Sequence, residues 1–159
     1  EWDEIAEELE TANATPDDVA ATRDAYLIFL EHFRANVAAA FAAVADAPDG
    51  AVVIHCVGGK DRTGLLCAFL LQLAGVPDDE IADDYALSEE RLLPRHQGWL
   101  DAAETHEERE RLRRIAQCPA DAMRGVLREL ERRYGGVAGY LRAAGVGEDQ
   151  LERAGSRLR

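Results

Sequence analysis

A cysteine and an arginine lie in one short glycine-rich segment, with five residues between them. The segment covers residues 55–64 and reads HCVGGKDRTG. Gly58 and Gly59 allow successive backbone N–H groups to turn toward one anion, and a helix that begins near Arg62 adds the positive end of its dipole. A thiol held over such groups ionises near neutral pH. The segment therefore predicts an anion-binding loop in which Cys56 is a nucleophile.

The neighbouring side chains are of types that suit a phosphate group. The planar guanidinium of Arg62 matches two phosphate oxygens better than an ammonium does. Thr63 can donate its hydroxyl to the Cys56 sulfur and stabilise the thiolate, while His55 is expected to orient the loop through backbone hydrogen bonds. The predicted phosphate-binding residues are Val57, Gly58, Gly59, Lys60, Asp61 and Arg62.

Two simpler interpretations of the segment are weaker. A nucleotide-binding loop needs Ser or Thr directly after its lysine to bind magnesium, and here Asp61 follows Lys60. An inert buried cysteine is the usual state of a thiol beside an apolar segment. The ordered combination of Cys56, five residues, Arg62 and Thr63 favours the nucleophile over both.

The segment resembles the signature of the cysteine-dependent protein tyrosine phosphatase superfamily. Its full form resembles the bacterial and fungal branch of tyrosine and lipid phosphatases, and residues 81–88 and 123–140 are similar to that branch as well. The resemblance implies a dual-specificity phosphatase that hydrolyses phosphate monoesters, phosphotyrosine and phosphoinositides among them, through a cysteinyl-phosphate. It assigns Cys56 as nucleophile, Arg62 as phosphate clamp and Thr63 as partner of the thiolate.

Asp61 has two interpretations. The resemblance implies that an aspartate inside the loop acts as the general acid or helps to position it. A carboxyl group that protonates a leaving oxygen needs a pKa near the working pH, and the cations at positions 60 and 62 oppose such a rise. The alternative is that Asp61 pairs with a neighbouring cation or caps the loop.

Lys60 is the one lysine in a chain with 17 arginines. A compact ammonium on a flexible stem at the rim of a phosphate loop suits a second phosphate on the substrate. The alternative is that the lysine occurs here by compositional chance. The resemblance to lipid phosphatases agrees with the first interpretation.

Outside the loop, apolar residues predict mostly helices. Residues 51–54 form a β-branched apolar run that predicts a buried parallel strand, and residues 65–73 predict a core helix behind the loop. An apolar stripe predicts one long helix over residues 15–47. Residues 91–100 predict a less regular stretch, and further helices are expected over the remainder of the chain.

One strand cannot form the parallel sheet that its apolar character requires, because each strand must pair with a neighbour. Members of the resembled branch have further strands before this point. We therefore expect an α/β fold with a central parallel sheet flanked by helices. Residues 1–159 are then the helix-rich C-terminal part of a single phosphatase domain, with the N-terminal strands outside the given sequence.

The chain is acidic, with a formal net charge of −13, and residues 1–50 hold 12 acidic residues against 2 arginines. This charge argues against nucleic acid as a partner, and the absence of a run of 18 apolar residues argues against stable membrane insertion. The expected partner is a phosphorylated protein or phosphoinositide substrate, with no metal and no cofactor. Three cysteines without metal-like spacing favour a reducing compartment, so we expect the cytoplasm, with secretion without a visible signal and the oligomeric state left open.

Two alternative functions stay open. A phosphatase-like module would bind phosphorylated ligands with little or no hydrolysis, which fits the lack of a visible general acid outside the loop. Sulfur transfer also uses cysteines in anion-binding loops, but the Lys60, Asp61, Arg62 and Thr63 content suits phosphate better.

Overall fold

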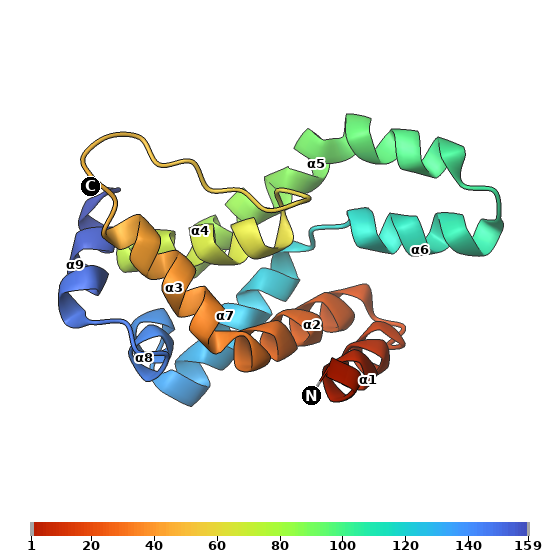
Figure 1. Ribbon diagram of the computed structural model, residues 1–159. Coiled ribbons are helices and arrows are strands. Elements are labelled where there is room, and N and C mark those ends of the chain that lie inside the picture. The colour runs from red at the N-terminus through yellow and green to blue at the C-terminus, as the bar shows by residue number, and fades with distance from the viewer. Residues whose placement is uncertain (1, 159) are drawn as a thin grey trace.

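The computed structural model describes residues 2–158, and every regular element in that range is a helix (Figure 1). In chain order the helices are α1 (Trp2–Asn13), α2 (Asp18–His32), α3 (Arg34–Ala45), α4 (Asp61–Leu73), α5 (Asp78–Ala102), α6 (His106–Ala116), α7 (Ala120–Tyr134), α8 (Val137–Ala143) and α9 (Glu148–Ser156). The predicted helix-rich character of this portion is confirmed.

Helix α4 follows the glycine-rich loop directly and holds it against the core. Its residues Leu65, Ala68 and Phe69 are buried, and it packs against α3, α5, α8 and α9. The ring of Phe69 meets Tyr140 of α8 edge-on, with 5.7 Å between the ring centroids. A loop attached to so apolar a helix is fixed at its C-terminal end by burial of that helix.

The predicted long helix over residues 15–47 is in fact two helices. Asp17 caps α2 by accepting hydrogen bonds from the N–H groups of Val19 and Ala20, and the chain bends by 84° between α2 and α3. The apolar stripe continues through the bend, so both helices present apolar residues to the core.

Among residues 2–158 no single helix is long and apolar enough to cross a membrane. Helices α2 and α3 reach that length and composition only as a bent pair.

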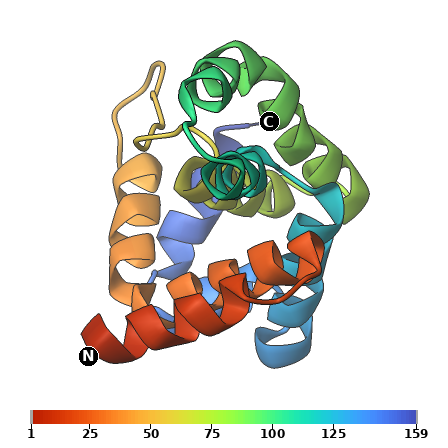
Figure 2. The ribbon, with the colours of Figure 1, turned by 90° about the vertical axis from the view of Figure 1, so that its right-hand side faces the viewer.

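The predicted buried strand at residues 51–54 is wrong for this structure. The segment is extended loop, and the side chain of Val53 is 84 % exposed. Figures 1 and 2 both show the connection from α3 to α4 as a loop at the edge of the helical body. Within residues 2–158 no strand lies beside this segment to pair with its N–H and C=O groups, so the central parallel sheet is not part of the described structure.

Helices α5 and α6 form an antiparallel hairpin that extends from the rest of the molecule (Figure 1). The less regular stretch predicted at residues 91–100 is helical, and Pro94 lies inside α5. Because proline has no N–H, the carbonyl of Glu90 lacks its usual helical hydrogen-bond donor. Both residues are exposed, so water can donate to this carbonyl instead. At the base of the hairpin, the N–H of Cys118 donates to Glu89 Oε2 at 2.8 Å, which ties the α6–α7 connection to α5.

Candidate active site

Cys56 lies in the loop before α4, and its sulfur accepts a hydrogen bond from the N–H of Gly59 at 3.2 Å. Gly59 has φ +77°, a left-handed conformation that glycine adopts without strain and that turns its N–H back to the sulfur. Partial burial alone would raise the pKa of the Cys56 thiol. The donor groups near the sulfur, which are the Thr63 hydroxyl and the N–H groups of Thr63, Gly59 and Gly58, favour the thiolate, outweigh burial and lower this pKa to about 7.

Thr63 is positioned by the first turn of α4. Its Oγ1 is buried and has no partner of standard hydrogen-bond geometry among the described residues, yet its interaction with the sulfur is one cause of the lowered Cys56 pKa. An unpaired buried hydroxyl costs free energy, and a thiolate accepts a hydrogen bond better than a thiol does. The position of Thr63 therefore favours the ionised form of Cys56.

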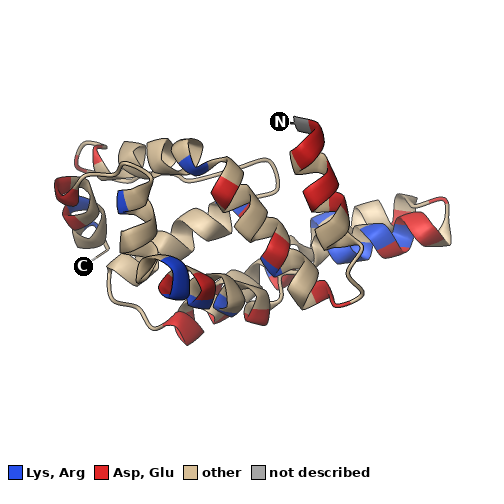
Figure 3. Cartoon of the chain, turned by 90° about the horizontal axis from the view of Figure 1, so that it is seen from below, with Lys and Arg blue, Asp and Glu red and all other residues tan. Residues whose placement is uncertain are grey.

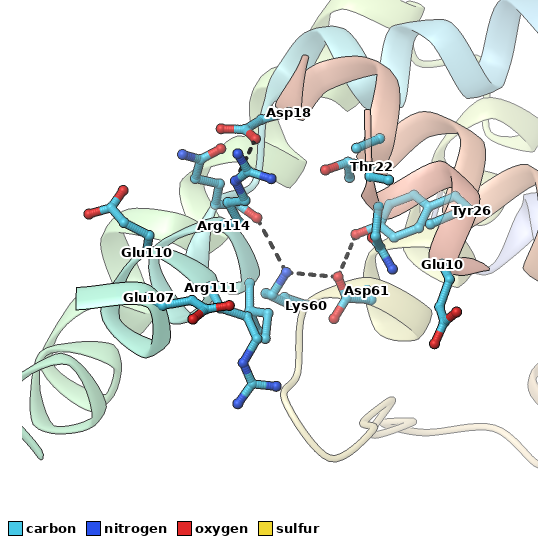
Figure 4. Close-up of a pocket in the computed structure, with 16 residues that line it drawn as sticks. Glu10, Asp18, Thr22, Tyr26, Lys60, Asp61, Glu107, Glu110, Arg111 and Arg114 are labelled. Carbon is cyan, nitrogen blue, oxygen red and sulfur yellow. Dashed lines mark hydrogen bonds and ion pairs between the residues drawn. The ribbon is translucent and has the colours of Figure 1, made fainter. Parts of the chain in front are cut away.

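The side chains of Lys60 and Asp61 reach the α6–α7 connection and α2, respectively (Figure 4). The Lys60 ammonium donates to Asp61 Oδ1 at 2.8 Å and to the carbonyl of Gln117 at 3.3 Å. Asp61 Oδ1 also accepts the hydroxyl of Tyr26 at 2.6 Å. The sequence offered an ion pair with a neighbouring cation as the alternative role of Asp61, and this pair is present with Lys60. The catalytic role of Asp61 stays a prediction.

The sequence predicted that the Lys60 ammonium lies at the exposed rim of the loop. This prediction is wrong, because only 6 % of the residue is exposed. It instead lines a pocket of about 780 Å³ between α1, α2 and α6, which Asp61 also lines. The other charged residues of the lining are Glu10, Asp18, Glu107, Glu110, Arg111 and Arg114 (Figure 4). The ribbon of Figure 3 is coloured for acidic residues along α1 and for both acidic and basic residues along α6. Substrate contact by Lys60 stays a prediction.

The other predicted loop residues are more open to solvent. Arg62, the second residue of α4, is exposed and so free to meet an incoming anion. Val57 is 79 % exposed, and its carbonyl accepts a hydrogen bond from Arg95 Nη1 at 3.4 Å. His55 is exposed and has no side-chain hydrogen bond within the described chain, so its orienting part stays a prediction.

Sequence reasoning missed Arg95 as a residue that holds the loop. The Arg95 guanidinium lies over the ring of Trp99, 5.1 Å from its centroid, and reaches the Val57 carbonyl from α5. The neighbouring His96 is buried, and burial lowers its pKa, as do the charges of Lys60 and Arg95. The only sequence signal was a cluster of charged and aromatic residues in the 91–100 stretch.

Sequence reasoning also gave no structural reason for the last glycine of the loop segment. A Cβ atom at Gly64 would lie 2.8 Å from Cδ2 of Tyr85. Helix α4 therefore approaches the Tyr85 ring more closely than any other residue type allows at this position. The same ring carries the hydroxyl that contacts Tyr26, with 2.7 Å between the two oxygens.

No group of three or more His, Cys, Asp or Glu side chains suited to a metal ion lies within residues 2–158. The expectation that the chemistry needs no metal stays a prediction.

The amino-acid sequence of the chain is similar to those of known phosphatases. A sequence model described as tyrosine phosphatase family matches residues 2–159. The chain is 35 % identical over 144 residues to a tyrosine-protein phosphatase of Nostoc commune, covering 85 % of this chain and 48 % of that protein. It is 28 % identical over 114 residues to the triple specificity protein phosphatase PtpB of Mycobacterium tuberculosis, covering 64 % and 41 %. The chain spans less than half the length of both relatives.

Proposed function

Because the chain belongs to the tyrosine phosphatase family, as its loop residues predicted, we propose that it hydrolyses phosphotyrosine in proteins with Cys56 as the nucleophile. The observation that supports this most strongly is a Cys56 thiol whose pKa is lowered to about 7 beside the N-terminus of α4. The thiolate is the form of cysteine that attacks phosphorus, so a substantial fraction of the residue is reactive at neutral pH.

The proposed reaction has two steps. In the first, the Cys56 sulfur forms a bond to phosphorus while the bond from phosphorus to the tyrosine oxygen breaks, and the leaving oxygen takes a proton from Asp61. Arg62 and the loop N–H groups stabilise the equatorial oxygens. In the second, water attacks phosphorus, gives a proton to Asp61 and releases phosphate and the thiolate.

Phosphoinositides are a second candidate substrate class, favoured by the position of Lys60. Its ammonium has three N–H groups, of which two donate to Asp61 and Gln117, and the third can donate to a ligand in the pocket that Lys60 lines. The triple-specificity name of the Mycobacterium tuberculosis relative also supports a broad substrate range. The five carboxylates that line the pocket, Asp61 among them, oppose a polyanionic headgroup, which ranks phosphotyrosine first.

The test is phosphate release by the 159-residue chain from a phosphotyrosine peptide, a phosphothreonine peptide and phosphatidylinositol monophosphates. Cys56→Ser removes the proposed nucleophile. Lys60→Ala removes the proposed second contact, and Arg109→Ala serves as its control, since Arg109 is an exposed cation of α6 outside the pocket lining.

We expect turnover of the phosphotyrosine peptide that is lost in Cys56→Ser. Loss of lipid turnover in Lys60→Ala but not in Arg109→Ala would support the second substrate class. If labelled phosphopeptide binds but none of the substrates is hydrolysed, the enzyme proposal is refuted and the phosphopeptide-binding module replaces it.

A further inference from the structure

We infer that Tyr26 of α2, supported by Tyr85 of α5, is a positioning residue that fixes the Asp61 carboxylate for proton transfer. This inference rests on the proposed function, because it concerns the acid of that reaction. Nothing in the loop sequence points to either tyrosine. Tyr26 lies within the apolar stripe of residues 15–47 and Tyr85 within residues 81–88, and both belong to helices remote from the loop in sequence.

The directions of the hydrogen bonds follow from the number of protons. Tyr26 has one hydroxyl proton, which it donates to Oδ1 of Asp61 at 2.6 Å. The contact of 2.7 Å between the two tyrosine oxygens must therefore be a donation from Tyr85 to Tyr26. Burial raises the pKa of both phenols, so both keep their protons at any working pH.

The two donors leave the carboxylate one oxygen for chemistry. Tyr26 and Lys60 both donate to Oδ1, while Oδ2 has no hydrogen-bond partner among residues 2–158. When Asp61 is protonated, its proton must therefore lie on Oδ2, because Oδ1 already faces two donors. Two donors of fixed position also prevent rotation of the carboxylate, so Oδ2 keeps one direction.

The tyrosines are rigid enough to hold this direction. Tyr26 is 7 % exposed and Tyr85 is 3 % exposed, and their rings meet edge-on with centroids 6.2 Å apart. Gly64 allows α4 to press against the Tyr85 ring, which leaves the ring no room to turn toward the helix that carries Asp61. A support of this kind matters because an error of about 1 Å in a catalytic group costs as much as about a hundredfold in rate.

The experiment uses leaving groups that differ in their need for a proton. Phenyl phosphate expels a poor leaving group that requires protonation, whereas para-nitrophenyl phosphate expels one that leaves as an anion. We compare kcat/KM for both substrates in wild type, Tyr26→Phe, Asp61→Asn and the double variant. Tyr140→Phe is the matched control, because its buried hydroxyl donates to the Leu30 carbonyl at 2.7 Å, away from the loop.

We expect Tyr26→Phe to lower kcat/KM for phenyl phosphate about tenfold and to leave that for para-nitrophenyl phosphate within about twofold, since general acid catalysis matters only for the first. The double variant should be no slower than Asp61→Asn, because the tyrosine acts through that carboxylate. Tyr140→Phe should change neither substrate.

Equal losses on both substrates would reduce Tyr26 to a structural residue, and no loss on either would overturn the inference entirely. Additive losses in the double variant would also overturn it, since the tyrosine would then act without Asp61. These outcomes are distinct from a failure of the proposed function, which wild-type protein would reveal by hydrolysing neither substrate.

Discussion

The phenolic oxygen of Tyr26 lies 2.6 Å from Oδ1 of Asp61, a residue 35 positions further along the chain. This one hydrogen bond connects α2 to the first residue of α4, directly behind the loop that carries Cys56. The loop is therefore supported on its inner side by buried polar groups, while its cysteine and arginine side is open. Buried polar groups with satisfied hydrogen bonds fix a local arrangement more sharply than apolar packing does.

The Cys56 thiol should react with iodoacetamide at a rate that follows its ionisation. Since its pKa is lowered to about 7, the rate should be half-maximal near pH 7 and fall about tenfold for each further pH unit below about 6. The measurement is the pH dependence of alkylation, read by mass spectrometry of the peptide that contains Cys56.

Cys67 and Cys118 are internal controls, because burial raises the pKa of both thiols and they should stay unmodified over the same range. In Thr63→Val, the loss of the hydroxyl should move the Cys56 midpoint up by about one pH unit. A midpoint unchanged by this substitution would contradict the stabilising part given to Thr63.

Gly64→Ala should destabilise the protein although alanine favours helices. The added Cβ would lie 2.8 Å from Cδ2 of Tyr85, and the ring cannot withdraw without breaking its contact with Tyr26. We expect the free energy of unfolding in urea to fall by about 1–3 kcal/mol, as overpacking usually costs.

Gly98→Ala is the matched comparison, since Gly98 is also helical but has nothing within 4 Å of its Cβ position. That substitution should raise the free energy of unfolding by about 0.5–1 kcal/mol. Equal effects of the two substitutions would show that Gly64 is not required by its contact with Tyr85.

Lys60→Met should also lower the free energy of unfolding. Methionine keeps much of the buried stem but leaves the Gln117 carbonyl without its Lys60 donor and Asp61 Oδ1 with Tyr26 as its one remaining donor, which costs about 1–3 kcal/mol. Arg113→Met is the control, because the Arg113 pair with Glu110 is solvent-exposed and should contribute less than about 1 kcal/mol. A loss no greater than that of Arg113→Met would mean that Lys60 makes no stabilising contacts.

The sequence predicted what depends on local residue types. The start of α4 beside the loop and its apolar interior both follow from short-range signals. Family membership likewise follows from the order of residues 55–64.

What failed depends on distant partners. The apolar run at residues 51–54 predicted a strand, but a strand exists only where another lies beside it. The bend between α2 and α3 was invisible because the apolar stripe keeps its period through it. The apolar stripe of residues 15–47 includes Tyr26 but does not indicate that its hydroxyl contacts Asp61, because a pattern specifies a face and not which polar atoms meet there.

The most direct test of the proposed mechanism is to trap the cysteinyl-phosphate. The chain is mixed rapidly with a phosphotyrosine peptide, quenched in acid during turnover and digested, and the peptide that contains Cys56 is weighed by mass spectrometry. We expect the added mass of one phosphoryl group on Cys56. In Cys56→Ser, both this added mass and phosphate release should be absent. A phosphoryl group on another residue, or phosphate release at the wild-type rate by Cys56→Ser, would contradict it.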